Sequence, residues 1–333
     1  MKIVIPMAGM GKRMRPHTLT IPKPLLPIAG KPIVHRLVED IARRCPEPIE
    51  EVAFVVGRFG EAVEQRLHEV AASVGARGSI HYQDEALGTA HAVLCAAAAL
   101  DGPVIVAFAD TLFRADATLD VDQEAIIWTQ RVDDPRAFGV VQLDEAGAIT
   151  AFVEKPQTFV SDLAIIGIYY FRDGARLRRE LQDLVDAGVL KSGEYQLTDA
   201  LENLKQDGVR FVPGQVDEWL DCGNKNATVQ TNQRYLEYLR DEDLVAPDAV
   251  VEGSVLVPPV YVGAGAEIRH AVVGPHVSVG AGTRIRRSVV SNSLIQEGSV
   301  LEGVNLSNSM IGNFVELYGR AEDLSLGDYS QVK

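Results

Sequence analysis

The chain has 333 residues, of which 47% are hydrophobic, and it carries a net charge of −14. This length suits two domains with a sizeable core. The negative charge argues against general binding to nucleic acids or anionic membranes, because such a field repels polyanions except where cations cluster. The three cysteines lie far apart without a CxxC spacing, so neither a disulfide framework nor a zinc site is indicated. No apolar run approaches the roughly 18 residues of a membrane span, and we expect a soluble, cytoplasmic protein.

Over the first 240 residues, short apolar runs alternate with helical patterns. Strands are predicted at residues 2–6, 52–56, 79–83, 104–108 and 125–129, and helices at 33–41, 89–100 and 226–240. The alternation predicts an α/β domain with a Rossmann-like, mostly parallel sheet and helices on both faces. In such sheets ligands bind at the carboxyl ends of the strands.

The pattern changes near residue 247, where short β-branched pieces alternate with glycine and small residues. Aliphatic residues recur about 17 positions apart, which corresponds to three hexapeptides per coil. The recurring pairs are Val262 with Val279, Ile268 with Ile285, and Val273 with Val290. We therefore predict domains at 1–240 and 247–333, the second being a solenoid of about four coils; a β-sandwich is the alternative. Because short coils bury little alone, we also expect a homo-oligomer.

The loop that follows the first strand, residues 9–25, combines a glycine turn with four cations. Glycine lets backbone N–H groups approach phosphate oxygens closely, and cations neutralise the charge that one turn cannot. The segment therefore predicts a triphosphate cradle, and a tight turn with solvated cations is the alternative. The cations are Lys12, Arg13, Arg15 and Lys23.

Two better-known glycine loops do not match. Met14 stands where a dinucleotide fingerprint needs its third glycine, and Arg13 stands where a Walker loop needs a hydroxyl. The continuation through Arg15-Pro16 and Pro22-Lys23-Pro24 resembles the signature loop of the sugar-1-phosphate nucleotidyltransferases. The resemblance covers essentially the whole chain, and the last third resembles the hexapeptide repeat of left-handed parallel β-helices. Together these features are most similar to long-form glucose-1-phosphate thymidylyl- or uridylyltransferases.

This resemblance implies a reaction in which a sugar-phosphate oxygen attacks the α-phosphorus of a nucleotide and releases pyrophosphate. A phosphate monoester is largely dianionic at neutral pH, so the reaction needs no protein base. Catalysis then reduces to alignment and charge neutralisation. Asp110 and Asp221 are predicted to hold Mg²⁺ at one sheet edge, although this chain has Ala109 where the family usually has glycine. A helix cap or turn is the alternative for Asp110.

The resemblance also implies roles for the loop. Arg13 is expected to grip the β- and γ-phosphates, and Lys23 to span the α-phosphate and the sugar phosphate. Lys12 and Arg15 either tune the field or are simply solvated. The expected backbone contacts to the nucleotide come from Ala8, Gly9 and Gly11.

Base recognition is predicted at Gln83 and Gly88. A glutamine amide donates and accepts at once, which matches the donor and acceptor edge of uracil or thymine, and Gly88 lets backbone groups complete the pairing. Guanylyl-transferring relatives commonly carry an acid near this position, so Gln83 favours UTP or dTTP over GTP. The alternative is an exposed glutamine without a role.

Sugar binding is predicted in the hairpin 139–155, through the Gly139 backbone and the Glu154-Lys155 pair. Asp162 is added to this set, although the family more often has asparagine there. The motif 193–199 resembles the family's linker into a helix near the active site. We assign it no chemistry and expect Thr198 or Asp199 to cap the helix.

Three alternatives for the function stay open. The enzymatic one is a mannose-1-phosphate guanylyltransferase. The second is a regulatory subunit that senses nucleotide or sugar without turnover. The third, a minor one, is acyl transfer by the tail, with His270 or His276 as the base.

Overall fold

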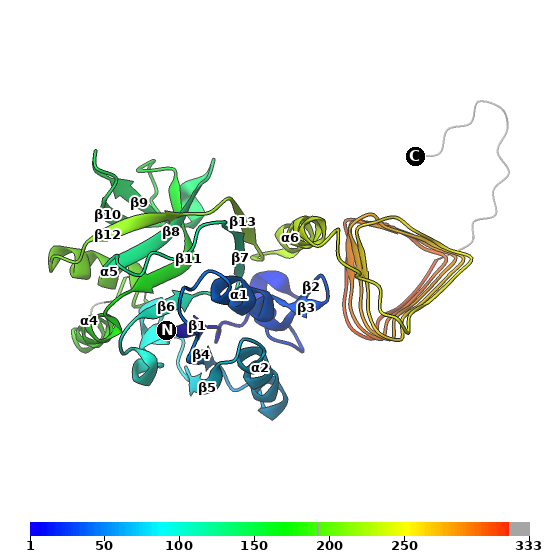
Figure 1. Cartoon of the computed structure of the whole chain (residues 1–333), viewed down its shortest axis with the longest axis horizontal. Helices are drawn as coiled ribbons and strands as arrows, with labels where there is room; N and C mark the ends of the chain where they lie inside the picture. Colours follow the sequence, from blue (N-terminus) through cyan, green and yellow to red (C-terminus); the bar gives the residue numbers. More distant parts are fainter. Residues whose placement is uncertain (189, 192, 320–333) are drawn as a thin grey trace. The chain divides into compact units, whose positions relative to one another are not determined.

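The computed structural model describes residues 1–188, 190–191 and 193–319 (Figure 1). Its contacts divide the chain into two compact units, Met1–Leu26 with Lys31–Ala227, and Pro27–Gly30 with the chain from Thr228 onward. Helix α6 (Lys225–Tyr238) begins in the first unit and continues into the second. Among the described residues, no helix is long and apolar enough to cross a membrane.

The first unit contains a nine-stranded sheet with the order β10-β9-β11-β6-β1-β4-β5; off this path, β8 pairs with β11, and β12 pairs with β8. Strands β6, β1, β4 and β5 are parallel, whereas β11 runs antiparallel to β6, β8 and β9. The α/β fold class is confirmed. The sheet is mixed, whereas we predicted a mostly parallel one, because apolar periodicity does not report the direction of a partner strand. The bounds are β1 Lys2–Pro6, β4 Glu51–Val56, β5 Arg77–Tyr82, β6 Val104–Ala107, β8 Ala125–Arg131, β9 Gly139–Leu143, β10 Ile149–Glu154, β11 Leu163–Phe171 and β12 Phe211–Gln215.

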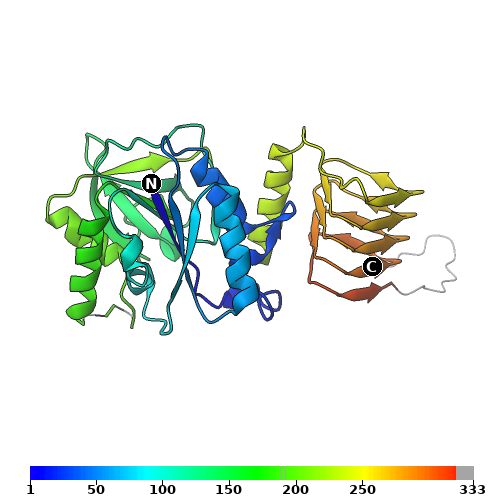
Figure 2. The same cartoon turned by 60° about the horizontal axis from the view of Figure 1, so that its bottom comes forward.

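Helices cover both faces of this sheet (Figure 2). Helices α3 (Thr89–Leu94), α4 (Gly174–Asp186) and α5 (Leu197–Gln206) share a buried core with alternate residues of β1 and β4, including Val4 and Val55. The intervening residues Ile3 and Ile5 are also buried, on the side of α1 (Ile33–Ala42) and α2 (Glu61–Ser73). Helix α3 is shorter than predicted, and a 3₁₀ turn at Ala97–Ala99 follows it. Alanine favours helix without marking where one stops.

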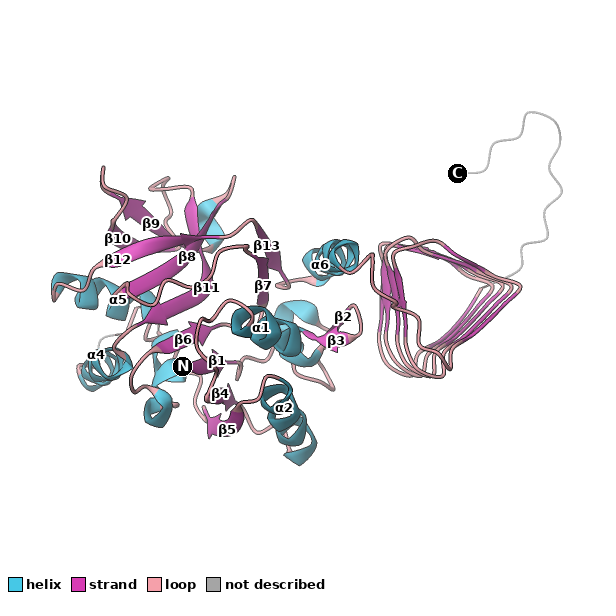
Figure 3. Cartoon of the chain, in the orientation of Figure 1, coloured by secondary structure: helices cyan, strands magenta, loops and turns pink. Residues whose placement is uncertain are grey.

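The second unit contains three stacks of short parallel strands that form a left-handed β-helix of triangular section (Figure 3). The predicted pairs Val262–Val279, Ile268–Ile285 and Val273–Val290 are register partners, so the 17-residue repeat is confirmed. The stacks comprise β14 (Val250–Glu252), β17 (Glu267–Arg269), β20 (Arg284–Arg286), β23 (Val300–Glu302) and β26 (Glu316–Tyr318); β15 (Val255–Leu256), β18 (Val272–Val273), β21 (Val289–Ser291) and β24 (Asn305–Ser307); and β16 (Val260–Val262), β19 (Val277–Val279), β22 (Ser293–Ile295) and β25 (Met310–Ile311).

Within this unit, α6 packs against the β16-β19-β22-β25 stack. The side-chain oxygen of Asn232 accepts hydrogen bonds from the Ser278 hydroxyl at 2.7 Å and from the Ala29 N–H at 2.9 Å. Ala29 belongs to the turn between β2 (Pro27–Ile28) and β3 (Lys31–Pro32). The turn continues at Gly30, where an added Cβ would lie 2.2 Å from the Tyr261 ring. One buried asparagine thus joins the helix, the turn and the coils.

Candidate active site

A cleft of about 540 Å³ lies at the carboxyl ends of β1 and β6 in the first unit. This volume suits a small-molecule ligand. Eight of the residues predicted to bind nucleotide, sugar phosphate or metal line it: Ala8, Gly9, Gly11, Arg13, Lys23, Gln83, Gly88 and Asp110. Segments far apart in the sequence therefore meet at the edge where the α/β pattern predicts a ligand.

The glycine loop leaves β1 at Pro6 and turns at Gly11. Gly11 has φ +55°, and an added Cβ would lie 3.0 Å from the Cβ of Lys23. The Thr18 hydroxyl donates to the Gly11 carbonyl at 2.9 Å and fixes the turn. Only glycine meets both demands, a left-handed φ and a close neighbour. The turn is followed by a 3₁₀ helix, Lys12–Met14, whose exposed Lys12 and Arg13 line the cleft.

Lys23 is the buried cation of the cleft. It lies between Pro22 and Pro24 in the sequence and begins the 3₁₀ turn Lys23–Leu25. Its exposed fraction is 7%. Its Nζ lies 3.0 Å from a carboxylate oxygen of Asp110. A buried ammonium group needs such a partner, because desolvation without one costs several kcal/mol. The predicted phosphate-binding lysine and the predicted metal ligand therefore form one ion pair.

Asp221 reaches this pair from a different element than we predicted. It ends β13 (Glu218–Asp221), which pairs with β7 (Thr111–Arg114) in a separate two-stranded ribbon and not at the edge of the main sheet. The ribbon brings the backbone next to Asp221 close to that of Asp110, since the N–H of Cys222 donates to the carbonyl of Asp110 at 3.0 Å. The sequence predicted that both aspartates lie at strand ends, but not that a separate two-stranded ribbon brings them together.

Burial raises the pKa of the Asp221 carboxyl, and the neighbouring charge of Asp110 raises it further. The N–H of Gly223, which donates to Asp221 at 2.8 Å, and the cations Lys23 and Arg13 oppose this rise. Two neighbouring carboxylates, one of them desolvated, are a setting that a divalent cation would relieve. No cluster of three or more ligating side chains exists among the described residues.

The loop predicted to read the base is held by the motif at 193–199, to which we assigned no chemistry. An added Cβ at Gly88, where φ is +109°, would lie 2.5 Å from the carbonyl oxygen of Tyr195. Tyr195 also exchanges backbone hydrogen bonds with Leu87 and Ala90, at 2.8 and 3.0 Å. The neighbouring Glu194 lines the cleft. Sequence reasoning missed this contact because nothing local reveals the pairing of distant loops.

The capping prediction for this motif was wrong. Helix α5 has Gln196 as its N-cap residue, so Thr198 lies inside the first turn. The Thr198 hydroxyl donates to Glu154 at 3.3 Å, and the N–H of Leu197 is instead capped by the Thr89 hydroxyl at 2.9 Å. The start of α5 therefore connects the loop predicted to read the base with the hairpin predicted to bind the sugar.

The predicted sugar-binding residues fall into two groups. Glu154 is the cross-strand partner of Gly139, where an added Cβ would lie 3.1 Å from the Glu154 carboxylate. Lys155 Nζ lies 3.3 Å from Glu154. Asp162 has a different partner, Arg131, whose Nη1 donates to its two carboxylate oxygens at 2.5 and 2.6 Å.

Tyr169 links the hairpin to the cleft. Burial raises the pKa of its hydroxyl, and the charges of Glu154 and Asp110 raise it further, so both carboxylates lie within electrostatic reach of this ring. The ring also packs edge-on against Phe108, which lines the cleft, at a centroid distance of 6.1 Å. The hairpin therefore adjoins the nucleotide-sized cleft.

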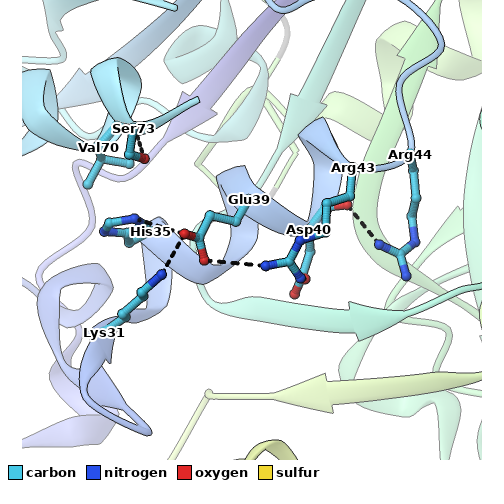
Figure 4. Close-up of polar contacts among 8 residues, drawn as sticks. All are labelled: Lys31, His35, Glu39, Asp40, Arg43, Arg44, Val70 and Ser73. Atoms are coloured by element: carbon cyan, nitrogen blue, oxygen red, sulfur yellow. Dashed lines mark hydrogen bonds and ion pairs between the residues drawn. The ribbon is translucent and has the colours of Figure 1, made fainter. Parts of the chain in front are cut away.

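A second polar cluster lies on α1 (Figure 4). Glu39 accepts from Lys31 at 2.6 Å and pairs with His35 at 3.3 Å. Burial alone would raise the pKa of Glu39, but the hydrogen bond and charge of Lys31, together with the charges of His35 and Arg36, outweigh it, and the pKa is lowered. Nearby, Arg44 donates to the carbonyls of Asp40 and Ala115 beside an apolar cavity of about 280 Å³. The contacts of Lys31 and Arg44 therefore stabilise α1.

Two protein families match parts of this chain. Residues 2–238 match the family described as "Nucleotidyl transferase", and residues 236–293 match "GlmU-like, C-terminal hexapeptide". The chain is 30% identical to a glucose-1-phosphate thymidylyltransferase of Streptomyces griseus, covering 100% of this chain and 99% of that one. It is also 30% identical to the low-salt glycan biosynthesis nucleotidyltransferase Agl11 of Haloferax volcanii, covering 77% and 72%.

Among solved structures, a UDP-glucose pyrophosphorylase in complex with UDP-glucose is similar, with a TM-score of 0.59 and 25% identity. The match covers 71% of this chain and 98% of that one. The first family match alone spans more than half of the chain. The chain therefore belongs to the nucleotidyl transferase family and carries a C-terminal hexapeptide-repeat domain.

Proposed function

We propose that the protein transfers a nucleotidyl group from UTP or dTTP to a hexose 1-phosphate, with glucose 1-phosphate favoured, and releases pyrophosphate. The observation that carries the proposal is the Lys23–Asp110 ion pair inside a glycine-walled cleft, with Asp221 beside it. The names of the relatives, a thymidylyltransferase and a UDP-glucose pyrophosphorylase, support the choice of base and sugar.

In this proposal a phosphate oxygen of the sugar phosphate forms a bond to the α-phosphorus while the bond to the β-phosphate oxygen breaks. No proton has to move, so the protein aligns the two substrates and neutralises charge. The exposed Arg13 binds the β- and γ-phosphates of the departing pyrophosphate. Lys23 binds the α-phosphate and the incoming sugar phosphate, which offer its ammonium group an alternative to Asp110.

We assign the remaining site residues to the nucleotide base and to the sugar phosphate. Gln83 and the backbone at Gly88 read the pyrimidine edge, and Glu154 and Lys155 meet the sugar hydroxyls and phosphate. Asp162, whose carboxylate pairs with Arg131 at 2.5 Å, stays in the proposed sugar-binding set. Loss of a phosphate-binding cation or of a metal-binding aspartate would mark a sensor subunit, and all four such residues are present, which favours an enzyme: Arg13, Lys23, Asp110 and Asp221.

We further propose that Asp110 and Asp221 hold Mg²⁺. Two carboxylates with nearby phosphates suit this ion, which keeps several waters and prefers oxygen ligands. The raised pKa of Asp221 and the neighbouring charge of Asp110 fit a site that a bound cation would stabilise. When bound, the ion would supply charge neutralisation at the phosphates.

The first test is pyrophosphate release with Mg²⁺, across five nucleoside triphosphates and the 1-phosphates of glucose, mannose and N-acetylglucosamine. A signal confined to UTP or dTTP with glucose 1-phosphate supports the proposal. Preference for GTP with mannose 1-phosphate would keep the reaction type but refute the assigned base and sugar. Silence across the grid would favour the sensor subunit.

The second test replaces Asp110 with Asn. We expect turnover to fall at least about 100-fold, because charge stabilisation at a transition state is commonly worth this much. Mn²⁺ binding, followed by water-proton relaxation, should weaken in parallel. Asp101→Asn, at an exposed loop position, is the matched control and should leave both unchanged. Undiminished metal-dependent turnover in the Asp110 variant would contradict the ligand assignment.

Oligomerisation remains part of the proposal. Val255, Val272 and Val289 are exposed at equivalent positions of three successive coils. Such a stripe on one stack is a surface that a second copy could cover. Light scattering coupled to gel filtration tests the expectation, and a monomer at micromolar concentration would contradict it.

A further inference from the structure

The side chain of Gln83, which follows β5, is held from one side by the first turn of α3. Its amide nitrogen lies 3.1 Å from the carbonyl oxygen of Gly88 and 3.2 Å from Nδ1 of His91. Gln83 and Gly88 line the cleft, as do Thr89 and Ala92 of α3, whereas His91 is not among the residues that line it. His91 is half-buried and contacts the base-reading side chain without facing the ligand space itself.

These two contacts define which way the amide points. The Gly88 carbonyl oxygen can only accept, so the group that approaches it must be the amide NH₂. The second N–H of that NH₂ then donates to His91 Nδ1, which must be the unprotonated ring nitrogen. Both amide hydrogens are engaged, so the prediction that this amide donates and accepts at once to a base does not hold, and the amide oxygen is the group that Gln83 has left to offer.

A cysteine one turn along α3 packs on the same imidazole. Cys95 Sγ lies 3.9 Å from Nδ1 and 4.0 Å from Nε2 of His91. Burial raises the pKa of the Cys95 thiol, which keeps it uncharged. A neutral sulfur at these distances makes only a weak contact, so the amide of Gln83 is the stronger partner of Nδ1.

We infer that His91 is a positioning residue that fixes the Gln83 amide with its oxygen toward the base, and thereby selects uracil or thymine against cytosine. Uracil and thymine carry an N3–H, which an amide oxygen accepts, whereas cytosine presents a bare N3 acceptor at the same place. A freed amide could turn its NH₂ outward and accommodate cytosine. The inference rests on the proposed function, because it assumes that Gln83 reads a pyrimidine.

The test measures kcat/KM for UTP, dTTP and CTP with glucose 1-phosphate in the full-length protein. In His91→Leu, which cannot accept a hydrogen bond, the ratio of kcat/KM for UTP to that for CTP should fall about tenfold, the scale of one hydrogen bond in a specific site. His91→Gln offers an amide oxygen from the same helical position and should keep the ratio within about twofold. The KM for glucose 1-phosphate should stay unchanged in both.

A double-mutant cycle separates positioning from general loss of structure. In a Gln83→Leu background, His91→Leu should leave the UTP-to-CTP ratio unchanged, because the group that it positions is gone. Cys95→Ala should leave the ratio of the wild-type protein unchanged as well. If His91→Leu does not fold, His91→Met, with a longer and more flexible side chain, takes its place.

The outcomes distinguish the inference from the proposed function. A wild-type protein that prefers GTP or ATP would overturn the base assignment on which both depend. A wild-type protein that prefers UTP or dTTP, with a ratio that His91→Leu does not change, would overturn the role of His91 alone. An equal loss of the ratio in His91→Gln and His91→Leu would do the same, because it would show that bulk or packing matters and the acceptor does not.

Discussion

Gly88 and Gly60 have nearly the same backbone conformation, with φ +109° and ψ −179° at Gly88 and φ +92° and ψ +163° at Gly60. Each is the N-cap residue of a helix, α3 or α2. They differ in their surroundings, since an added Cβ at Gly88 would lie 2.5 Å from the Tyr195 carbonyl oxygen, and nothing lies within 4 Å at Gly60. The pair separates the cost of an unusual φ from the cost of a steric clash.

We therefore expect Gly88→Ala to lower the free energy of unfolding more than Gly60→Ala. Strain alone should cost about 1–3 kcal/mol in both variants, and the clash with Tyr195 adds to it only at Gly88. Urea unfolding measures both values, and nucleotide KM should rise only in Gly88→Ala. Equal losses of stability would show that the loop at 194–196 yields without cost.

At the scale of elements, much of the candidate site could be predicted from the sequence. Lys23 and Asp110 belong to segments whose composition predicts phosphate and metal binding, and the structure brings them together in one ion pair. The β-helix register was also predictable, because one buried aliphatic residue per strand makes the repeat visible in sequence. Pairings between distant segments were not, and Thr198 with Glu154 or Tyr195 with Leu87 depend on tertiary packing that no local pattern encodes.

The end of helix α6 contacts the β-helix through the pair of Glu237 and His276. The hydrogen bond from His276 holds the pKa of Glu237 below its ordinary value, with help from the charges of His276 and Arg240. A lowered carboxyl pKa adds stability above the unfolded-state pKa, about 4.3, and this stability is lost as pH falls through the lower folded-state value.

Glu237→Gln should therefore cost about 0.2–1 kcal/mol of unfolding free energy near pH 6, the range for a partly exposed pair. The difference between wild type and variant should shrink as pH falls from about 4.3 toward 3, where the carboxyl becomes protonated in both states of the wild type. Urea unfolding followed by far-UV circular dichroism measures it. A difference that stays constant between pH 6 and pH 3 would mean that the carboxylate charge plays no part.

At the scale of the whole molecule, the division into two units lets their stabilities be observed separately. The two tryptophans of the chain, Trp128 and Trp219, both belong to the first unit, so tryptophan fluorescence follows that unit. Far-UV circular dichroism follows both units. The residues that line the cleft all belong to the first unit, whereas the turn at Pro27–Gly30 belongs to the second.

Tyr261→Ala should lower the stability of the second unit alone. Its ring lies against Gly30, and its removal leaves a cavity that should cost about 2 kcal/mol, the lower end for a large-to-small change because the ring is only half-buried. The dichroism transition should move to lower urea while the fluorescence transition and kcat stay within error of the wild type. Tyr318→Ala, at a tyrosine that is 56% exposed, is the matched control and should change neither transition. If fluorescence and dichroism instead shift together in Tyr261→Ala, the two units unfold as one cooperative body, and the prediction that the second unit loses stability alone is wrong.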